Sequence, residues 1–229
     1  MFNRRNKVNS FILFVVLNSI IHAQEKNDQI LNFSFYSGNN RLILNEYSSS
    51  KVKFHSIVIQ PPQSRSFLGL RIGYVKEYSG GRYSDGYSDY YVNNEVFYYI
   101  QPQLYIQGRY FGAVPGMLFI RTIETEDGPG GLVLPTISLR FGVLNEYFLS
   151  VDVLNEIYFG LFSINIHYLF KDNISKLMLG IVKSNEFNYT GISYEINFKV
   201  FNRFYLAIRG NINTENSNAY TQIGAGYVL

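Results

Sequence analysis

The chain has 229 residues and a formal charge of +3, and it contains no cysteine and no tryptophan. Without cysteine, disulfides and thiolate metal sites are excluded. Charged residues make up only 16% of the chain, against about 25% in typical soluble domains. Three of the cations precede residue 24, so the rest of the chain carries no net charge that would attract nucleic acid.

The first 23 residues have the layout of a secretory signal peptide. Three cations, Arg4, Arg5 and Lys7, precede the apolar run FILFVVLNSII at 11–21, and the small residue Ala23 follows. This order predicts export through a Sec-type pathway and cleavage after Ala23. The apolar run is shorter than the about 20 residues of a membrane-spanning helix, and no later segment approaches one.

The rest of the chain alternates between apolar and polar residues, which is the spacing of β-strands. In 192–200, for example, Ile196 and Phe198 share one face, while Asn197 and Lys199 share the other. Segment 109–122 is strand-like but is interrupted by Pro115 and Gly116. The pattern predicts ten strands, at 66–77, 96–106, 109–122, 132–143, 146–154, 157–170, 176–183, 192–200, 204–212 and 218–229.

Residues 24–65 leave two possibilities open. Segments 30–37 and 52–60 also alternate, and together they form a further hairpin that gives twelve strands. Alternatively, this region is an N-terminal arm ahead of a ten-stranded barrel. We favour an all-β, antiparallel up-and-down transmembrane barrel of twelve strands that occupies 24–229 as a single domain.

The connections between the strands also suggest a barrel in a membrane. The connections at 78–94 and 124–131 are longer than those near 107, 144, 171 and 201, and all the longer ones fall at one end. Outer-membrane barrels show this difference between outside loops and periplasmic turns. Around Asn155-Glu156 we expect a two-residue hairpin loop that pairs Leu154 with Ile157 and Val153 with Tyr158.

The alternation does not itself say which face is dry, and a soluble lipocalin-like barrel would be apolar inside. The polar faces here carry mostly Ser, Thr, Asn, Gln and Gly, whereas a solvated surface would carry more Lys and Glu. We therefore expect the apolar faces to contact lipid and the polar faces to line a lumen. The predicted lumen network consists of Arg71, Arg140, Asp152, His167, Glu195, Lys199 and Arg209.

The last residues provide a resemblance to known families. Gly224, Tyr227 and the terminal Leu229 follow the pattern Gly-x-x-apolar-x-aromatic, with Leu in place of the usual terminal Phe. In this the chain resembles bacterial outer-membrane β-barrels, including the small OmpA- and OmpX-like barrels of Gram-negative bacteria. The resemblance implies residence in the outer membrane, with its lipid and the barrel assembly machinery as partners. It implies no particular activity.

The sequence offers little for catalysis or metal binding. Ser163, Asn165 and His167 share one strand face, and outer-membrane phospholipases use these residue types. Same-face neighbours on one strand are about 7 Å apart, however, which is beyond hydrogen-bond reach. Asp85 and Asp89 lack the regular spacing of calcium ligands. We therefore predict no catalytic residue, no metal and no cofactor.

The long connection at 78–94 is the predicted binding surface. It contains the duplication YSDGYSD, and tyrosine, serine and glycine are typical of adaptable binding surfaces. The hypothesis is a non-enzymatic barrel that is structural or binds an extracellular ligand, whose nature stays open. The alternatives are a narrow channel for small solutes and a barrel-embedded hydrolase. The binding candidates are Tyr83, Asp85, Tyr87, Asp89 and Tyr90.

Overall fold

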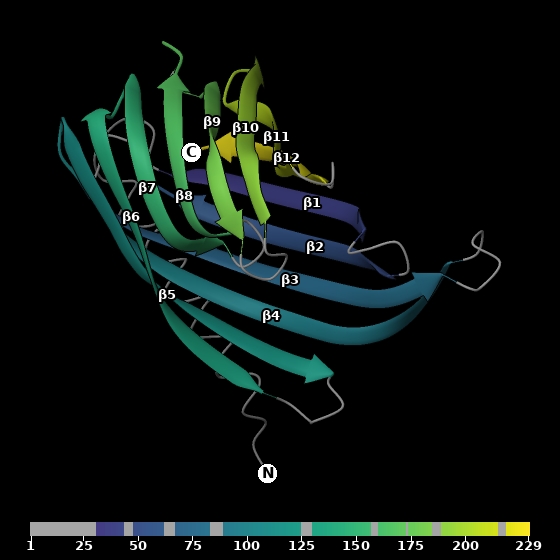
Figure 1. Ribbon diagram of the computed structural model, residues 1–229. Helices are drawn as coiled ribbons and strands as arrows, with labels where there is room; N and C mark the ends of the chain where they lie inside the picture. Colours follow the sequence, from purple (N-terminus) through teal and green to yellow (C-terminus); the bar gives the residue numbers. More distant parts are fainter. Residues whose placement is uncertain are drawn as a thin grey trace.

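The computed structural model is a closed barrel of twelve antiparallel strands, in which each strand pairs with its neighbours in the chain and the first pairs with the last (Figure 1). It describes residues 31–43, 48–61, 67–82, 89–124, 130–156, 160–172, 174–184, 189–214 and 219–229; side chains are not described at 40–51, 77–95, 123–129, 155–161 and 184–189. The strands are β1 (Asn32–Ile43), β2 (Ser48–Gln60), β3 (Phe67–Arg82), β4 (Asp89–Gln107), β5 (Phe111–Glu124), β6 (Gly131–Val143), β7 (Tyr147–Glu156), β8 (Gly160–Leu169), β9 (Lys176–Ser184), β10 (Tyr189–Phe201), β11 (Phe204–Asn213) and β12 (Ala219–Val228).

The N-terminal region settles the number of strands. Residues 32–43 and 48–60 form the hairpin β1–β2, and β1 then pairs with β12 from Asn32↔Val228 to Ser37↔Ile223. The prediction of twelve strands is confirmed, and the arm ahead of a ten-stranded barrel is wrong. The proposed signal peptide at 1–23 lies outside the described residues.

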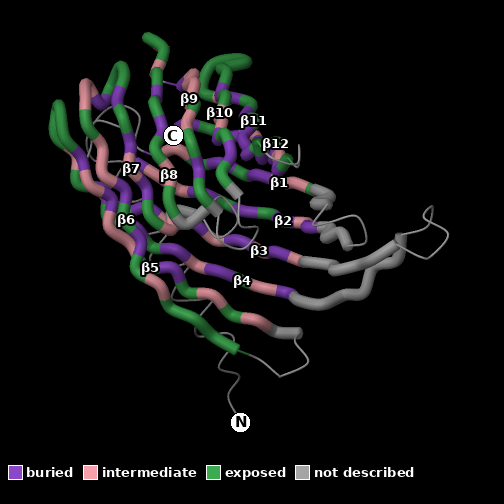
Figure 2. The backbone as a smooth tube through the Cα atoms, in the orientation of Figure 1, coloured by how far each residue is buried: buried purple, intermediate pink, exposed green. Residues whose placement is uncertain are grey.

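Buried and exposed residues alternate along the strands (Figure 2), and the exposed ones are largely apolar. Ile196 on β10 is 44% exposed on the outside, whereas its neighbour Asn197 is 5% exposed in the lumen. Inward-facing Ser34, Gln101 and Asn165 are similarly buried. The barrel is therefore apolar outside and polar inside, so the lipocalin-like alternative does not apply.

Several tyrosine rings lie close against glycines of the neighbouring strand inside the barrel. Tyr99 on β4 is the cross-strand partner of Gly73 on β3, and a Cβ on that glycine would fall 2.2 Å from the ring. Only a residue without a side chain allows this close approach. Further pairs of the same kind are Tyr105 over Gly69, Tyr36 over Gly224 and Tyr205 over Gly226.

Two apolar clusters occupy the lumen. The loop-side cluster lies toward the end opposite Leu31 and Leu229 and contains Val52, Phe54, Val75, Tyr99, Leu118 and Tyr220. The turn-side cluster lies toward the end that carries Leu31 and Leu229, and it contains Tyr36, Val58, Ile174, Tyr205, Ala207 and Val228. Ile174 belongs to the turn between β8 and β9, so this turn reaches across the lumen to β1, β2, β11 and β12.

The carboxylate of Asp172 holds that turn. It accepts hydrogen bonds from the backbone N–H groups of Ile174, at 2.9 Å, and Ser175, at 2.7 Å. The Ser175 hydroxyl donates a third at 2.6 Å. Ser175 Oγ also accepts a bond from the backbone N–H of Lys199, which connects the turn to β10. This arrangement places Ile174 in the turn-side cluster.

The predicted two-residue loop at Asn155-Glu156 is wrong. Glu156 is still within β7 and pairs with Gly160, and the register shifts between Val153 and Glu156, where Leu154 has a positive φ of 53°. Val153 consequently pairs with Phe162 instead of Tyr158. This offset is even, so every side chain keeps its predicted face despite the change of partner.

The predicted loop at 78–94 is largely strand. β3 continues to Arg82 and β4 begins at Asp89, and Arg82 pairs with Asp89. At 16 and 19 residues these are the longest strands of the described chain, and they reach beyond their neighbours (Figure 1). The difference between the two barrel ends therefore arises from an extended hairpin rather than from a long loop.

No helix in the described ranges is long and apolar enough to cross a membrane.

Candidate functional site

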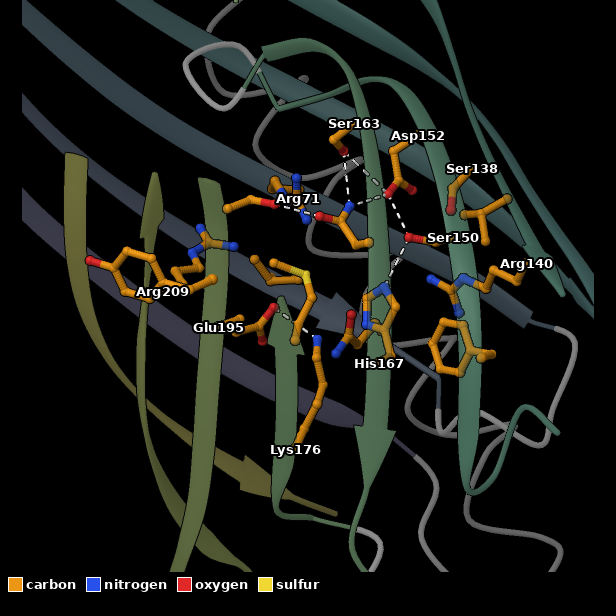
Figure 3. A pocket seen from close by; sticks show the side chains of 18 of the residues that line it. Arg71, Ser138, Arg140, Ser150, Asp152, Ser163, His167, Lys176, Glu195 and Arg209 are labelled. Carbon is orange, nitrogen blue, oxygen red and sulfur yellow. Dashed lines mark hydrogen bonds and ion pairs between the residues drawn. The ribbon is translucent and has the colours of Figure 1, made fainter. Parts of the chain in front are cut away.

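The lumen contains a cavity of about 120 Å³ lined mostly by polar side chains (Figure 3). Its walls come from the inward faces of strands around the barrel, where serines, asparagines and charged residues alternate with outward apolar residues. The titratable residues of its lining, tyrosines aside, are Arg71, Arg140, Asp152, His167, Lys176, Glu195 and Arg209. This cavity is the candidate functional site.

A serine and a histidine from neighbouring strands meet beside this cavity. Ser150 Oγ on β7 lies 2.9 Å from His167 Nε2 on β8. The His167 ring stacks on Phe148, with ring centroids 4.2 Å apart. Sequence reasoning did not find Ser150, because it lies on another strand and the predicted β7–β8 register was wrong. The predicted partner, Ser163, instead shares hydrogen bonds with Asn165 and Asp152.

The carboxylate of Asp152 is on the wrong side of this pair for a catalytic triad. The Ser150 hydroxyl donates to Asp152 Oδ2 at 2.7 Å, so His167 Nε2 is the donor in its contact with Ser150. In a serine hydrolase the histidine accepts the serine proton, and the acid orients the far side of the histidine ring. Here His167 Nδ1 has no hydrogen-bond partner among the described residues.

Hydrogen bonds connect Asp152 to two further strands. Asn165 on β8 donates its Nδ2 proton to Asp152 Oδ2 at 2.8 Å, and Ser193 on β10 donates to Asn165 Oδ1. The three residues are at most 5% exposed. Because a buried carboxylate is stable only when it is well hydrogen-bonded, this network fixes one wall of the cavity.

On the adjoining strands β9 and β10, the Lys176 ammonium and the Glu195 carboxylate form an ion pair at 2.8 Å. Glu195 is also the direct cross-strand partner of Arg209. The Arg209 guanidinium donates to Gln222 and, at 3.3 Å, to Ser56 on β2, and it lies over the Tyr36 ring at 3.6 Å from the centroid. These contacts connect β9, β10 and β11 to the first two strands across the lumen.

The other predicted lumen residues occupy different depths. Arg71 is 7% exposed and lines the cavity. Arg140 is half-buried, with its guanidinium 5.3 Å from the Tyr105 ring centroid and 5.6 Å from that of Phe148. Lys199 is exposed near the end of β10, at the rim and outside the cavity lining, because the strand ends at Phe201.

The predicted loop candidates are mostly beyond what the structure describes. Tyr83, Asp85 and Tyr87 lie outside the described residues. Asp89 and Tyr90 are the first residues of β4, where they pair with Arg82 and Gly81. In the described ranges, no three His, Asp or Glu side chains are grouped so that they could hold a metal ion.

The predicted assembly signal lies at the β1–β12 seam. Tyr227 and Leu229 face outward and are 46% and 40% exposed. Gly224 faces inward beneath the Tyr36 ring, which the sequence pattern did not indicate. The backbone N–H of Leu229 donates to the carbonyl of Leu31 at 2.8 Å, so hydrogen bonds hold the chain end at the seam.

A closed antiparallel barrel with an apolar exterior and a polar, side-chain-filled interior defines an integral membrane β-barrel protein. No protein-family model matches the chain, and no curated protein matches it.

Distant likenesses exist among solved structures. Outer membrane phospholipase A from Escherichia coli is 14% identical, with a TM-score of 0.43 over 92% of this chain and 96% of that one. The Salmonella typhi outer membrane phospholipase dimer with bound calcium is 14% identical, with a TM-score of 0.44 over 93% and 96%. Pseudomonas putida OprB is 9% identical, with a TM-score of 0.28 over 87% and 91%.

Proposed function

We propose that the protein is a non-conducting, non-enzymatic barrel of the outer membrane that acts as a structural or surface-binding protein through the extended β3–β4 hairpin. The filled lumen carries this proposal. The loop-side cluster occupies one end of the lumen. At the other end, Ile174 extends from its turn across the lumen and packs in the turn-side cluster. Between them lies the cavity of about 120 Å³.

The size of the barrel supports the same function. Barrels of about eight strands are filled by side chains, whereas porins of 16–18 strands enclose an aqueous channel. With twelve strands, this barrel lies between these two sizes. Whether its lumen is open therefore depends on how far the long inward side chains fill it. Arg209, which bonds from β11 to Ser56 on β2, is one of the links that close the path.

The site for surface binding is the tip of the hairpin. The facing ends of β3 and β4 reach beyond their neighbours at this end of the barrel, and the sequence that joins them begins the Tyr-Ser-Asp duplication at 83–89. With Leu31, Leu229 and the short turns on the periplasmic side, the barrel points this hairpin away from the cell. A tyrosine-rich tip in that position suits contact with an extracellular ligand.

Single-channel recording in a planar bilayer tests the non-conducting barrel. The folded wild-type protein is expected to give no stable conductance step. The double variant Phe54→Ala, Leu118→Ala empties part of the loop-side cluster and is expected to conduct more readily than wild type. The control Ile208→Ala removes a similar apolar side chain from the lipid face and should stay silent. A steady channel in the wild-type protein would replace this proposal with the solute channel.

A barrel-embedded hydrolase is the second candidate, because Ser150 Oγ and His167 Nε2 are within hydrogen-bond distance. The placement of Asp152 on Ser150 argues against it. Hydrolysis of p-nitrophenyl butyrate by the folded protein in detergent distinguishes the two. We expect no turnover above a Ser150→Ala variant. Turnover that Ser150→Ala abolishes and Ser163→Ala leaves intact would establish the hydrolase instead.

A further inference from the structure

The side chains around the lumen cavity carry an excess of positive charge. Four cations line it, whereas two carboxylates do; the cations are Arg71, Arg140, Lys176 and Arg209, and the carboxylates are Asp152 and Glu195. With His167 neutral, the lining therefore has a net charge of two positive units. Charged groups inside the lumen are less well solvated than in bulk water, so this excess is costly unless an anion offsets it.

The interactions of the two carboxylates do not remove the net positive charge of the lining. Glu195 forms its ion pair with Lys176. Asp152 accepts hydrogen bonds from the uncharged side chains of Ser150 and Asn165. Whatever further contacts Asp152 makes, two negative charges do not balance four positive ones.

Two neutral polar atoms of the cavity lining also lack a hydrogen-bond partner among the described residues. Ser138 Oγ and His167 Nδ1 are buried, and neither has a hydrogen-bond partner among the described residues. Their side chains are 2% and 8% exposed, and both line the cavity. Buried polar atoms are seldom left without a partner unless a ligand or ordered water supplies one.

The cationic groups converge on the cavity from different strands. Arg71 comes from β3, Arg140 from β6 and Arg209 from β11, and Figure 3 shows them on different sides of the cavity with His167 and Ser150 nearby. Guanidinium groups match the geometry of phosphate and carboxylate oxygens, because their N–H donors form a planar fork. Hydroxyl donors such as Ser138 add further contacts that a spherical halide would use less well.

We infer that the lumen cavity is a binding site for a small oxyanion of the phosphate class. The volume of about 120 Å³ is well above the roughly 30 Å³ share of a single water molecule, which leaves room for a tetrahedral oxyanion. The site goes beyond the proposed structural or surface-binding function and does not depend on it: a conducting and a non-conducting barrel could both hold an anion here.

Thermal unfolding of the full mature protein in a phosphate-free detergent tests the site. Inorganic phosphate is titrated at constant ionic strength, with chloride as the balancing anion. Saturable stabilisation by phosphate is expected. Arg140→Gln removes one charge-assisted donor and should weaken phosphate affinity about ten-fold or more. The matched control Arg203→Gln changes an exposed arginine in the β10–β11 turn and should leave the affinity unchanged.

A second variant keeps the test decisive if Arg140→Gln does not fold. Ser138→Ala deletes a single hydroxyl and should fold, and it should also weaken phosphate binding. Isothermal titration of the wild-type protein with phosphate measures the affinity without any variant. Absence of saturable binding in the wild-type protein would overturn the inference. So would equal affinities in Arg140→Gln, Ser138→Ala and Arg203→Gln, because binding would then be to the outer surface.

Discussion

The ring of Tyr36 on β1 lies against the bare Cα of Gly224 on β12, where the first and last strands close the barrel. The two residues are direct cross-strand partners, and a Cβ on Gly224 would fall 2.5 Å from Tyr36 Cδ1 and 2.6 Å from the carbonyl oxygen of Phe35. Gly224 belongs to the C-terminal pattern that we associated with assembly. The structure gives it a packing role as well.

Gly224→Ala is therefore expected to destabilise the seam by about 1–3 kcal/mol, as overpacking does in other close-packed interiors. Urea unfolding in phospholipid bilayers measures the change. Gly131→Ala is the control, because the nearest atom to a Cβ there is the carbonyl oxygen of Ile120 at 3.7 Å. Equal stabilities of the two variants would contradict the close packing at Gly224.

The orientation of the barrel faces can be tested with two neighbours on β9. Met178 lines the cavity, whereas Leu179 is 51% exposed on the outer surface. Leu179→Gln should lower the free energy of unfolding in bilayers by about 1–3 kcal/mol, because the amide loses its hydrogen bonds to water. Met178→Gln enters a polar lumen and should cost less than about 1 kcal/mol. The reverse order would mean that the barrel is apolar inside.

The outward side chains of the last strand allow recognition to be separated from backbone pairing. The double variant Tyr227→Ala, Leu229→Ala preserves the backbone hydrogen bonds of β12 but removes two exposed side chains. We expect it to refold in detergent with a normal heat-modifiable band, yet to insert poorly into the outer membrane of cells. Normal insertion in cells would show that these side chains are not an assembly signal.

The turn at Asp172 is expected to make the stability of the folded protein depend on pH. Burial raises the pKa of the Asp172 carboxyl, but hydrogen bonds from Ser175 and Ile174 outweigh burial, aided by the nearby Lys199 ammonium, so the pKa lies below its ordinary value. A depressed folded-state pKa contributes stability above the unfolded-state pKa, near about 4, and this is lost as pH falls through the folded-state value.

Asp172→Asn should therefore be less stable than the wild-type protein between pH 5 and 8, by roughly 0.5–1.5 kcal/mol. The difference should shrink below about pH 4, because the wild-type carboxyl is then protonated. Thermal melting across this pH range gives the measurement. A difference that stays constant down to the lowest pH would mean that the charge of Asp172 does not stabilise the turn.

The proposed orientation in the membrane can be tested by labelling, because the chain has no cysteine of its own. Ser84→Cys, between β3 and β4, should react with a membrane-impermeant maleimide in intact cells. Asn145→Cys, in the exposed β6–β7 turn at the opposite end, should react only after the cells are opened. If only Asn145→Cys were labelled in intact cells, the barrel would have the opposite orientation in the membrane.

The strands and their faces were predictable because alternation is a local pattern. Ile196 and Asn197 could be assigned to opposite faces from the sequence, since neighbouring residues on a strand point in opposite directions. The extension of β3 and β4 was not predictable, because its Tyr, Ser, Gly and Asp residues are typical of loops. Backbone pairing such as Arg82↔Asp89 forms there in spite of that composition.

The candidate site depended on contacts that no single segment encodes. The seven charged or histidine residues of the predicted lumen network all carry inward parity, but six of them line the cavity and Lys199 does not. The contact between Ser150 and His167 required the correct register of two strands, and the predicted hairpin loop had the wrong one. Ile174 reaches the lumen through the path of a turn, which alternation does not describe.

The pairing of β1 with β12 also determines how the barrel must fold. Asn32 and Val228 are partners although nearly the whole chain separates them, so the last contacts to form carry a large loop-closure entropy and are expected to be slow. Until they form, β1 and β12 are open edges whose unpaired N–H and C=O groups can pair with other chains. The interval between synthesis and closure is therefore the period in which this protein is most prone to aggregate.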